Sequence, residues 1–380
     1  MQVAIIEPVG GHGGMDYYDF GLCSGLAGAG VSAMLYTCDE TKRPDGMEGF
    51  HVGFKRIYGS SSRWVRAIRY VRGLCWSLRH ARRNGCKLAH FHFFHGSAME
   101  LVTVSIARAL GFRVVVTAHD VESFSGEGGV ATAQRTYAKA DAVIAHNSVT
   151  ALELVQKVGV KSGKIHVIPH GNYIDSIRSG ASLVEARDRL GIEQGTRMLL
   201  FFGQIKAVKG LDVLIEALPE VLASGENVRL VVAGKVWKDD FSVYQEIISR
   251  LSLERHVHLD IRYIEEDEAE LYYIASDLVV LPYRRIYQSG VLLMAMSHAR
   301  TVVASDLPGM AEVVTDGVDG FLFRRGDSSD LARVIIRALE GLSSSEVACR
   351  GKDLMERKYS WSAIAEQTRS AYEDVLQERG

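Results

Sequence analysis

The chain has 380 residues, of which 47% are hydrophobic and 24% are charged, and its formal net charge is -2. This length predicts two domains of ordinary size, and the composition is typical of a globular protein. The near-zero net charge argues against a dedicated nucleic-acid-binding protein, because such a protein needs a basic excess to displace counterions.

The cysteines and the start of the chain suggest a cellular compartment. None of the cysteines forms a Cys-x-x-Cys pair, and they stand far apart: Cys23, Cys38, Cys75, Cys86 and Cys349. We therefore expect free thiols in a reducing compartment and no metal site of the zinc type. The start of the chain lacks the features of a signal peptide, and no run reaches the roughly 18 apolar residues of a membrane span. We expect a cytoplasmic protein whose membrane contact is at most peripheral.

Short apolar runs alternate with helical patterns from one end of the chain to the other, which predicts parallel α/β layers. In the first half, strands are expected at Val3–Ile6, Ala33–Tyr36, Leu88–Phe93, Val114–Ala118, Ala142–Ala145 and His166–Pro169. A second series of strands is expected at Met198–Phe202, Val228–Ala233, Val257–Ile261, Leu278–Leu281, Thr301–Ala304 and Gly320–Phe323.

Two such series predict an α/β protein with two Rossmann-like lobes. We place the first lobe at residues 1–175 and the second at residues 176–360. Ligands of these sheets bind beyond the carboxyl ends of the strands, so the expected site is a cleft between the lobes.

A glycine-rich stretch, Gly10–Gly14, separates the first strand from a helix that starts near Met15. Glycine lets a backbone approach a ligand closely, and the free amides at a helix start favour phosphate. We predict that Gly13 and Gly14 lie near a phosphate group, and the alternative is a mobile turn. The glycines are out of register with G-x-G-x-x-G, which disfavours a dinucleotide site.

The segment Phe50–Met99 contains no Asp or Glu, and arginines recur in it. At about 100° per residue, one helical stripe collects Trp64, Ile68, Val71, Leu74, Cys75 and Leu78. We expect this stripe to pack on the first-lobe sheet. Because each cation near an anionic surface contributes about 1 kcal/mol, four arginines are candidates for contact with membrane lipid or a lipid-linked acceptor. They are Arg63, Arg66, Arg69 and Arg72. The alternative is an ordinary surface helix.

Two loops of the second lobe carry anion-binding features. Lys206 and Lys209 lie between Gly203 and Gly210, just before a helix, where their charge would stabilise a departing diphosphate. A later loop, Leu281–Leu292, places Ser289, Gly290 and Val291 at another helix start, where consecutive amides bind anions. Arg284 or Arg285 would add guanidinium donors for phosphate oxygens, and the alternative is a solvated arginine pair.

Together these stretches resemble the retaining glycosyltransferases of family 4, which have the GT-B fold. Gly203–Gly210 is similar to the family pattern G-R-x-x-x-x-K-G, and the similarity extends over most of the chain. Further matching stretches are Ala140–Ala145, Val167–Asn172, Ala275–Pro282, Ala295–Met296, Val302–Ser305, Glu312–Gly317, Gly320–Leu322 and Tyr359–Ala365. The resemblance implies that the last helix, about residues 361–380, crosses back to the first lobe.

The resemblance also implies roles for individual residues. The stretch Val116–Asp120 is similar to the family's strand end, which implies that His119 contacts the donor sugar. Lys209 would bind the donor diphosphate with the amides of residues 289–291, and no metal or other cofactor is expected. His90, His92 and His95 we assign to a buried strand and its end.

Two departures from the family pattern concern the donor. Gln204 stands at the usual arginine, and Lys206 or Arg284 would supply the missing charge. The usual E-x7-E glutamates are absent, because Ile286 and Met294 occupy their places.

We predict a hexosyltransferase that moves a sugar from a nucleotide-sugar donor to a glycan or lipid-linked acceptor in surface polysaccharide or glycolipid synthesis. The alternatives are a catalytically inactive nucleotide-binding partner protein, a nucleotide-sugar epimerase and, less favoured, a dehydrogenase.

Overall fold

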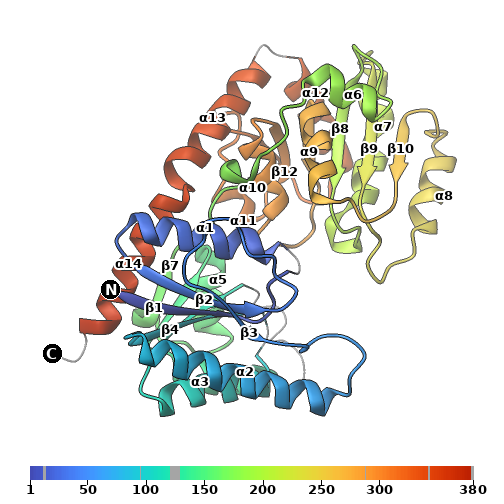
Figure 1. Cartoon of the computed structure of the whole chain (residues 1–380). Coiled ribbons are helices and arrows are strands. Elements are labelled where there is room, and N and C mark those ends of the chain that lie inside the picture. The colour runs from blue at the N-terminus through green and yellow to red at the C-terminus, as the bar shows by residue number, and fades with distance from the viewer. Residues whose placement is uncertain (12–13, 95, 120–128, 287, 341–342, 378–380) are drawn as a thin grey trace. The chain divides into compact units, whose positions relative to one another are not determined.

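The computed structural model describes residues 1–11, 14–94, 96–119, 129–286, 288–340 and 343–377. The chain forms two compact units (Figure 1). The first comprises Met1–Gly171 and Lys358–Gly380, and the second comprises Asn172–Arg357. Among the described residues no helix combines the length and the apolar character that crossing a bilayer requires.

The first unit is built on a seven-stranded parallel sheet with the order β3-β2-β1-β4-β5-β6-β7. The strands are β1 (Gln2–Glu7), β2 (Ser32–Cys38), β3 (Phe50–Phe54), β4 (Leu88–Phe93), β5 (Arg113–Ala118), β6 (Ala142–Ala145) and β7 (Ile165–Val167). The helices are α1 (Met15–Gly28), α2 (Arg63–Arg83), α3 (Ala98–Ala109), α4 (Gly129–Ala138), α5 (Ser148–Gln156) and α14 (Trp361–Gln377).

Strand β3 was not predicted from the sequence. Its residues Phe50–Val52 are half-buried, and it lies at the edge of the sheet, so it lacks the continuous apolar run of the inner strands. Glycines allow α2 to approach it closely. A Cβ atom added to Gly73 of α2 would lie 2.5 Å from the carbonyl oxygen of Gly53 in β3.

The C-terminal helix α14 packs on the first unit, as predicted. It contacts α1 through a face that carries Gly21 and Gly25. A Cβ atom on Gly21 would lie 2.1 Å from Cε2 of Trp361, so only glycine leaves room for the indole there. The same ring also lies against Gly171, where a Cβ atom would approach Cε2 to 2.4 Å.

The second unit has a six-stranded parallel sheet with the order β10-β9-β8-β11-β12-β13. Its strands are β8 (Arg197–Phe202), β9 (Val228–Ala233), β10 (Val257–Asp260), β11 (Leu278–Leu281), β12 (Thr301–Ser305) and β13 (Phe321–Phe323). Its helices are α6 (Leu183–Arg189), α7 (Leu211–Ala223), α8 (Ser242–Arg250), α9 (Glu266–Ala275), α10 (Gly290–Ser297), α11 (Pro308–Ala311), α12 (Ser328–Leu339) and α13 (Ser343–Lys358), which ends at the boundary between the units.

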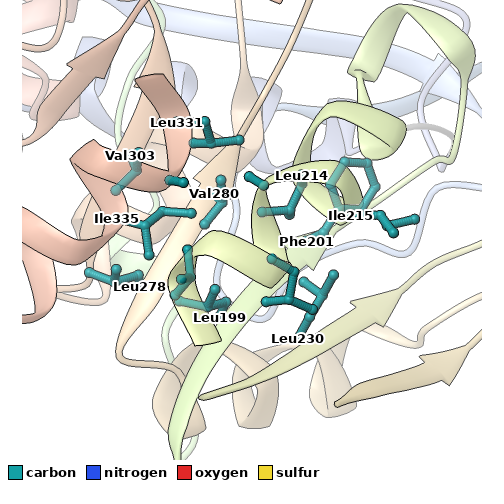
Figure 2. Close-up of a cluster of buried hydrophobic side chains, with 14 of the residues drawn as sticks. Leu199, Phe201, Leu214, Ile215, Leu230, Leu278, Val280, Val303, Leu331 and Ile335 are labelled. Carbon is teal, nitrogen blue, oxygen red and sulfur yellow. The ribbon is translucent and has the colours of Figure 1, made fainter. Parts of the chain in front are cut away.

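Figure 2 shows the core of the second unit, in which apolar side chains of the strands meet those of α7 and α12. Leu199, Val280 and Leu214 are completely buried there. The inner strands of both units are apolar on both faces because helices cover each sheet on both sides, and this explains why their strands could be predicted from continuous apolar runs.

In both sheets the order in which the chain adds strands reverses at the centre of the sheet. The chain runs from β1 to β2 and β3 on one side and then returns to β4 on the other, and β8 and β11 have the same relationship. Ligands of such sheets bind at this switch point, beside the carboxyl ends of the two central strands. In each unit the candidate residues should therefore follow β1 and β4, or β8 and β11.

Candidate active site

In the second unit, the loops after β8 and β11 meet at the switch point. The loop after β8 contains a short 3-10 helix, Ala207–Lys209, and ends at Gly210, whose φ of 65° favours glycine. A Cβ atom on Gly210 would lie 2.0 Å from the carbonyl oxygen of Pro282 in the loop after β11. Glycine at this position therefore lets the two loops come together.

Three of the predicted donor-binding residues are neighbours at this point. A Cβ atom on Gly203 would lie 3.6 Å from Nζ of Lys209 and 3.5 Å from Cγ2 of Val291. Nζ of Lys209 donates a hydrogen bond to the hydroxyl of Tyr283 at 3.2 Å and lies 4.8 Å from the centre of that ring. Tyr283, which the sequence analysis did not single out, thus orients the lysine.

The start of α10 presents its backbone to the same region. Ser289 caps the helix, because its hydroxyl accepts a hydrogen bond from the amide of Leu292 at 3.2 Å. The first amides of a helix have no partner inside the helix, so those of Gly290 and Val291 point outward from its N-terminus. A lysine charge beside free helix amides is an arrangement that attracts anions.

Arg284 has a different arrangement from the one predicted. Its guanidinium forms two hydrogen bonds with the carboxylate of Asp212, at 2.7 and 2.5 Å, and a third with the carbonyl of Ala207 at 3.1 Å. This pair neutralises Arg284 and ties the loop after β11 to the start of α7. Lys206 lies with its Nζ 5.6 Å from the ring centre of Trp237, which is exposed.

In the first unit, His119 belongs to a chain of three imidazoles. It follows β5, its Nε2 lies 3.2 Å from Nδ1 of His92, and its Nδ1 lies 3.3 Å from Nε2 of His146. Nδ1 of His146 lies 3.0 Å from the carbonyl oxygen of Ile168. Sequence reasoning had assigned His92 only to a buried strand and had missed His146, although both stand at or beside strand ends.

The carbonyl of Ile168 fixes the tautomers along this chain. A carbonyl oxygen only accepts, so Nδ1 of His146 carries the hydrogen. Burial lowers the pKa of His146 to about 4 and that of His119 and His92 well below the usual value, so the rings are neutral at pH 7. A neutral ring donates through one nitrogen and accepts through the other. His119 therefore donates from Nδ1 to His146 and accepts at Nε2 from His92, and in this arrangement it has no free N–H for a sugar.

Tyr18 of α1 forms the centre of this cluster. Its ring lies edge-on to four imidazoles and one indole, with ring centres 5.0 to 5.5 Å apart: His92, His119, His146, His170 and Trp361. Such edge-to-face contacts are the favoured geometry of aromatic pairs, so Tyr18 holds the histidines in place.

Two buried carboxylates lie behind His92. Oε2 of Glu7 and Oδ1 of Asp19 are each 3.9 Å from Nδ1 of His92, and all three side chains are fully buried. Burial raises the pKa of Glu7 to about 8 and that of Asp19 well above its usual value. Oε2 of Glu7 and both oxygens of Asp19 have no hydrogen-bond partner among the described residues. These three are also the residues of the described chain that could hold a metal ion, with ligand atoms within 4.8 Å of one another.

The glycine-rich stretch is only partly described. Gly13 lies outside the described residues. Gly14 has a φ of 79° as the N-cap of α1, and a Cβ atom there would meet nothing within 4 Å. Asp16 in the first turn of α1 accepts a hydrogen bond from the amide of Gly11 at 2.7 Å. The carboxylate thus brings negative charge to the helix start at which a phosphate was predicted.

The prediction for the apolar stripe of α2 was wrong in the N-terminal half of the helix. Trp64 and Ile68 are 69% and 60% exposed, whereas the buried face begins at Gly73 and Leu74. The expected stripe assumed a sheet along the whole helix, but β3 is short and only the C-terminal half of α2 packs on it. Arg69 instead holds the preceding loop, donating to the carbonyl of Arg56 at 2.9 Å.

The other predicted surface arginines divide between two places. Arg63 and Arg66 line a cavity of about 460 Å³ inside the first unit. Arg72 is exposed and lines a second hollow on the same helix, beside Trp76 and Arg79.

Comparison with known proteins adds the family context. A family model described as Glycosyltransferase Family 4 matches residues 12–174, and one described as Glycosyl transferases group 1 matches residues 196–341. The D-inositol 3-phosphate glycosyltransferase 2 of Catenulispora acidiphila is 28% identical over 247 residues, which are 63% of this chain and 57% of that protein. The lipopolysaccharide 1,2-N-acetylglucosaminetransferase of Salmonella typhimurium is 26% identical over 211 residues, 53% of this chain and 54% of that protein. The matched region therefore spans little more than half the length of these relatives.

The fold also has close counterparts among solved structures. The crystal structure of HepE from Anabaena in complex with UDP superposes with a TM-score of 0.74 at 18% identity, covering 98% of this chain and 100% of that one. This likeness and the two parallel sheets show the GT-B fold. Together with the two family models, the fold supports the assignment of the chain as a glycosyltransferase similar to family 4.

Proposed function

We propose that the chain is a retaining, metal-independent hexosyltransferase that uses a nucleotide diphosphate sugar as donor. The observation that carries this proposal is the grouping of Lys209, Gly203 and Val291 at the switch point of the second sheet. The lysine charge and the helix amides would bind the donor diphosphate and stabilise the charge that develops as it departs.

In the proposed reaction the bond between C1 of the sugar and the diphosphate oxygen breaks. A bond from C1 to the acceptor oxygen forms on the same face, and the departing phosphate oxygen takes the acceptor proton. Lys209 and the amides of Gly290 and Val291 supply fixed positive charge, so the chain's own groups perform the task that a metal ion performs elsewhere. The acceptor would be a glycan or a lipid-linked glycan at the cytoplasmic face of a membrane, in polysaccharide or glycolipid synthesis.

Binding of nucleotides to the purified protein tests the proposal. Because a ligand that binds only the folded state raises the unfolding midpoint, the midpoint should rise with one of UDP, GDP, ADP or dTDP. UDP is the first to test, since HepE was crystallised with it. The rise should disappear in Lys209→Ala and persist in Lys161→Ala, which changes an exposed lysine of the first unit. No response to any nucleotide would refute the donor site.

A second function is favoured by the residues at the glutamate positions. Ile286 and Met294 offer no carboxylate for ribose or sugar hydroxyls, as would suit a nucleotide-binding protein without transferase activity. Transfer of radiolabelled sugar from the responding donor to a membrane extract decides between the two. Label in a lipid or glycan product supports the transferase, and saturable nucleotide binding without any product supports the inactive partner.

A further inference from the structure

The cavity of the first unit lies at the carboxyl ends of β1 and β4, beneath the N-terminal half of α2. Its volume of about 460 Å³ falls within the roughly 300–1,000 Å³ of small-molecule sites. Its wall is largely apolar and includes Ile6, Met15, Ile57, Phe91, Phe93 and Met99. Figure 1 shows α2 and α3 on the same side of the sheet, and both helices contribute to this wall.

One face of α2 supplies the charge. Arg63, Arg66, Ala67 and Tyr70 all line the cavity and are spaced as i, i+3, i+4 and i+7 along one helical face. Nε of Arg66 is buried and has no hydrogen-bond partner among the described residues. A buried guanidinium nitrogen without a partner is costly, so it favours an anionic ligand at this position.

Apart from His92, whose Nε2 has no hydrogen-bond partner among the described residues, the other polar side chains of the wall are already engaged. The hydroxyl of Tyr70 lies 2.9 Å from Oγ1 of Thr103, and that of Tyr58 donates to the carbonyl of Pro8 at 3.1 Å. Glu100 accepts a hydrogen bond from the amide of Ser97 at 2.9 Å as part of the cap of α3. A bare sugar would therefore find few partners for its hydroxyls in this cavity, whereas an apolar chain would fill it without loss.

The opposite face of the same helical segment is exposed and apolar. Trp64, Val65 and Ile68 lie there among arginines, in a stretch without acidic residues. Exposed tryptophan and aliphatic side chains beside arginine are typical of segments at a membrane interface. A membrane on which this face rests would hold α2 at the bilayer surface, next to the helix that supplies the arginines of the cavity.

We propose that the cavity binds a lipid phosphate or lipid diphosphate, with the phosphate at Arg63 and Arg66 and the first part of the apolar chain inside the wall. The role of this lipid as sugar acceptor rests on the proposed function, but its binding does not. The phosphate of the lipid would contact the arginines, and its chain would contact the apolar wall. A free inorganic anion would contact the arginines only.

Isothermal titration of the full chain with three small probes, each in the same low concentration of a mild detergent, tests the proposal. Farnesyl diphosphate contains both parts of the ligand, farnesol only the apolar chain, and inorganic diphosphate only the anion. We expect farnesyl diphosphate to bind at least tenfold more tightly than either of the other probes. Equal affinity for farnesyl diphosphate and inorganic diphosphate would overturn the assignment.

Two variants of the same helix locate the site. Arg66→Ala should weaken farnesyl diphosphate at least tenfold, while Arg83→Ala, which lies outside the cavity, should leave it unchanged. An Arg66→Ala variant that loses affinity only for phosphatidylglycerol vesicles would overturn the proposal in favour of a purely surface role. If Arg66→Ala does not fold, Ala67→Phe, which fills the cavity, provides the same test.

The same sample separates this proposal from the proposed function. Binding of farnesyl diphosphate without any nucleotide response would support the lipid site and refute the donor site. A nucleotide response without farnesyl diphosphate binding would refute the lipid site alone.

Discussion

Nδ1 of His92 lies 3.2 Å from Nε2 of His119, at the ends of adjacent strands β4 and β5. This contact occupies Nε2 of the histidine that the family resemblance places beside the donor sugar. With its second nitrogen bonded to His146, His119 is held as a neutral ring whose Nδ1 carries the hydrogen. A role at the sugar therefore requires either the carbon edge of the ring or a rearrangement of this pair.

Replacement of His146 should change the tautomer of His119, because the carbonyl of Ile168 fixes the three rings from that end. In His146→Phe the acceptor of the His119 Nδ1–H is lost, and nitrogen chemical shifts should show His119 moving toward a mixture of both tautomers. Asparagine can place a carbonyl oxygen near the position of Nε2, so His146→Asn should restore the native pattern. If a transferase activity is found, its pH profile should follow the same order, with His146→Asn closer to the wild type than His146→Phe. Unchanged nitrogen shifts of His119 in His146→Phe would contradict the assignment.

Glu7 should destabilise the fold increasingly as the pH rises. Its pKa is raised from 4.5 to about 8 by burial, so between these values the folded state keeps a proton that the unfolded state releases. Glu7→Gln removes this difference, and its stability relative to wild type should be greater at pH 8 than at pH 5 by on the order of 1–3 kcal/mol. Denaturant unfolding of both proteins at pH 5 and pH 8 measures this difference in stability.

The control for this experiment is Glu220→Gln, which changes an exposed carboxylate of α7 and should show no such pH dependence. A Glu7→Gln variant whose stability relative to wild type is no greater at pH 8 than at pH 5 would contradict the prediction. It would mean that the carboxylate is ionised in the folded protein and balanced by a cation, and metal analysis of the purified protein would be the next measurement.

The buried histidines should make the first unit sensitive to acid. Burial lowers the pKa of His90 and His170 to about 3 and that of His146 to about 4. Below pH 6.5 these histidines bind protons in the unfolded state but not in the folded state. The free energy of unfolding therefore falls as the pH drops from 6.5 toward 4. The thermal midpoint should decline over this interval, and His146→Asn should make the decline shallower. A midpoint that stays constant from pH 6.5 to 4 would show that the rings are charged in the folded state.

Replacement of two glycines of α1, Gly21 and Gly28, by alanine should change the stability of the protein in opposite directions. In Gly21→Ala the new Cβ atom would lie 2.1 Å from the Trp361 ring, and overpacking of this kind costs about 1–3 kcal/mol. In Gly28→Ala the Cβ atom meets nothing within 4 Å, and alanine stabilises a helix by up to about 1 kcal/mol. Equal midpoints for the two variants would contradict the packing of α14 on α1.

The architecture could be predicted from the sequence because its signals are local. The strands of the two cores are continuous apolar runs bounded by turns, and the strand at Leu278–Leu281 was predicted with the bounds of β11. The glycines and lysines of the loop after β8 and the Ser289–Gly290 start of α10 also predict an anion site without reference to tertiary structure. The edge strand β3 lacked such a signal, because half-buried residues do not form an apolar run.

The missing parts of the candidate site depend on contacts between distant residues. Glu7, Asp19 and His92 belong to three separate elements, and nothing in their neighbourhoods along the chain indicates that they meet. The exposure of Trp64 and Ile68 likewise follows from where the sheet ends, which helical periodicity cannot reveal. Arg284 was predicted as a phosphate ligand because nothing near it along the chain reveals its carboxylate partner. That partner, Asp212, stands 72 residues earlier.

The position of Trp361 against Gly21, Gly25 and Gly171 has a consequence for how the protein is made. The first unit is assembled from two segments separated by the whole second unit, and the hydroxyl of Tyr372 on α14 lies 2.7 Å from Nδ1 of the buried His90 in the sheet. While the ribosome is still adding the second unit, the first sheet has one apolar face without its last helix. Residues 1–171 alone should therefore be prone to aggregation, and completion of the first unit must await the synthesis of α14.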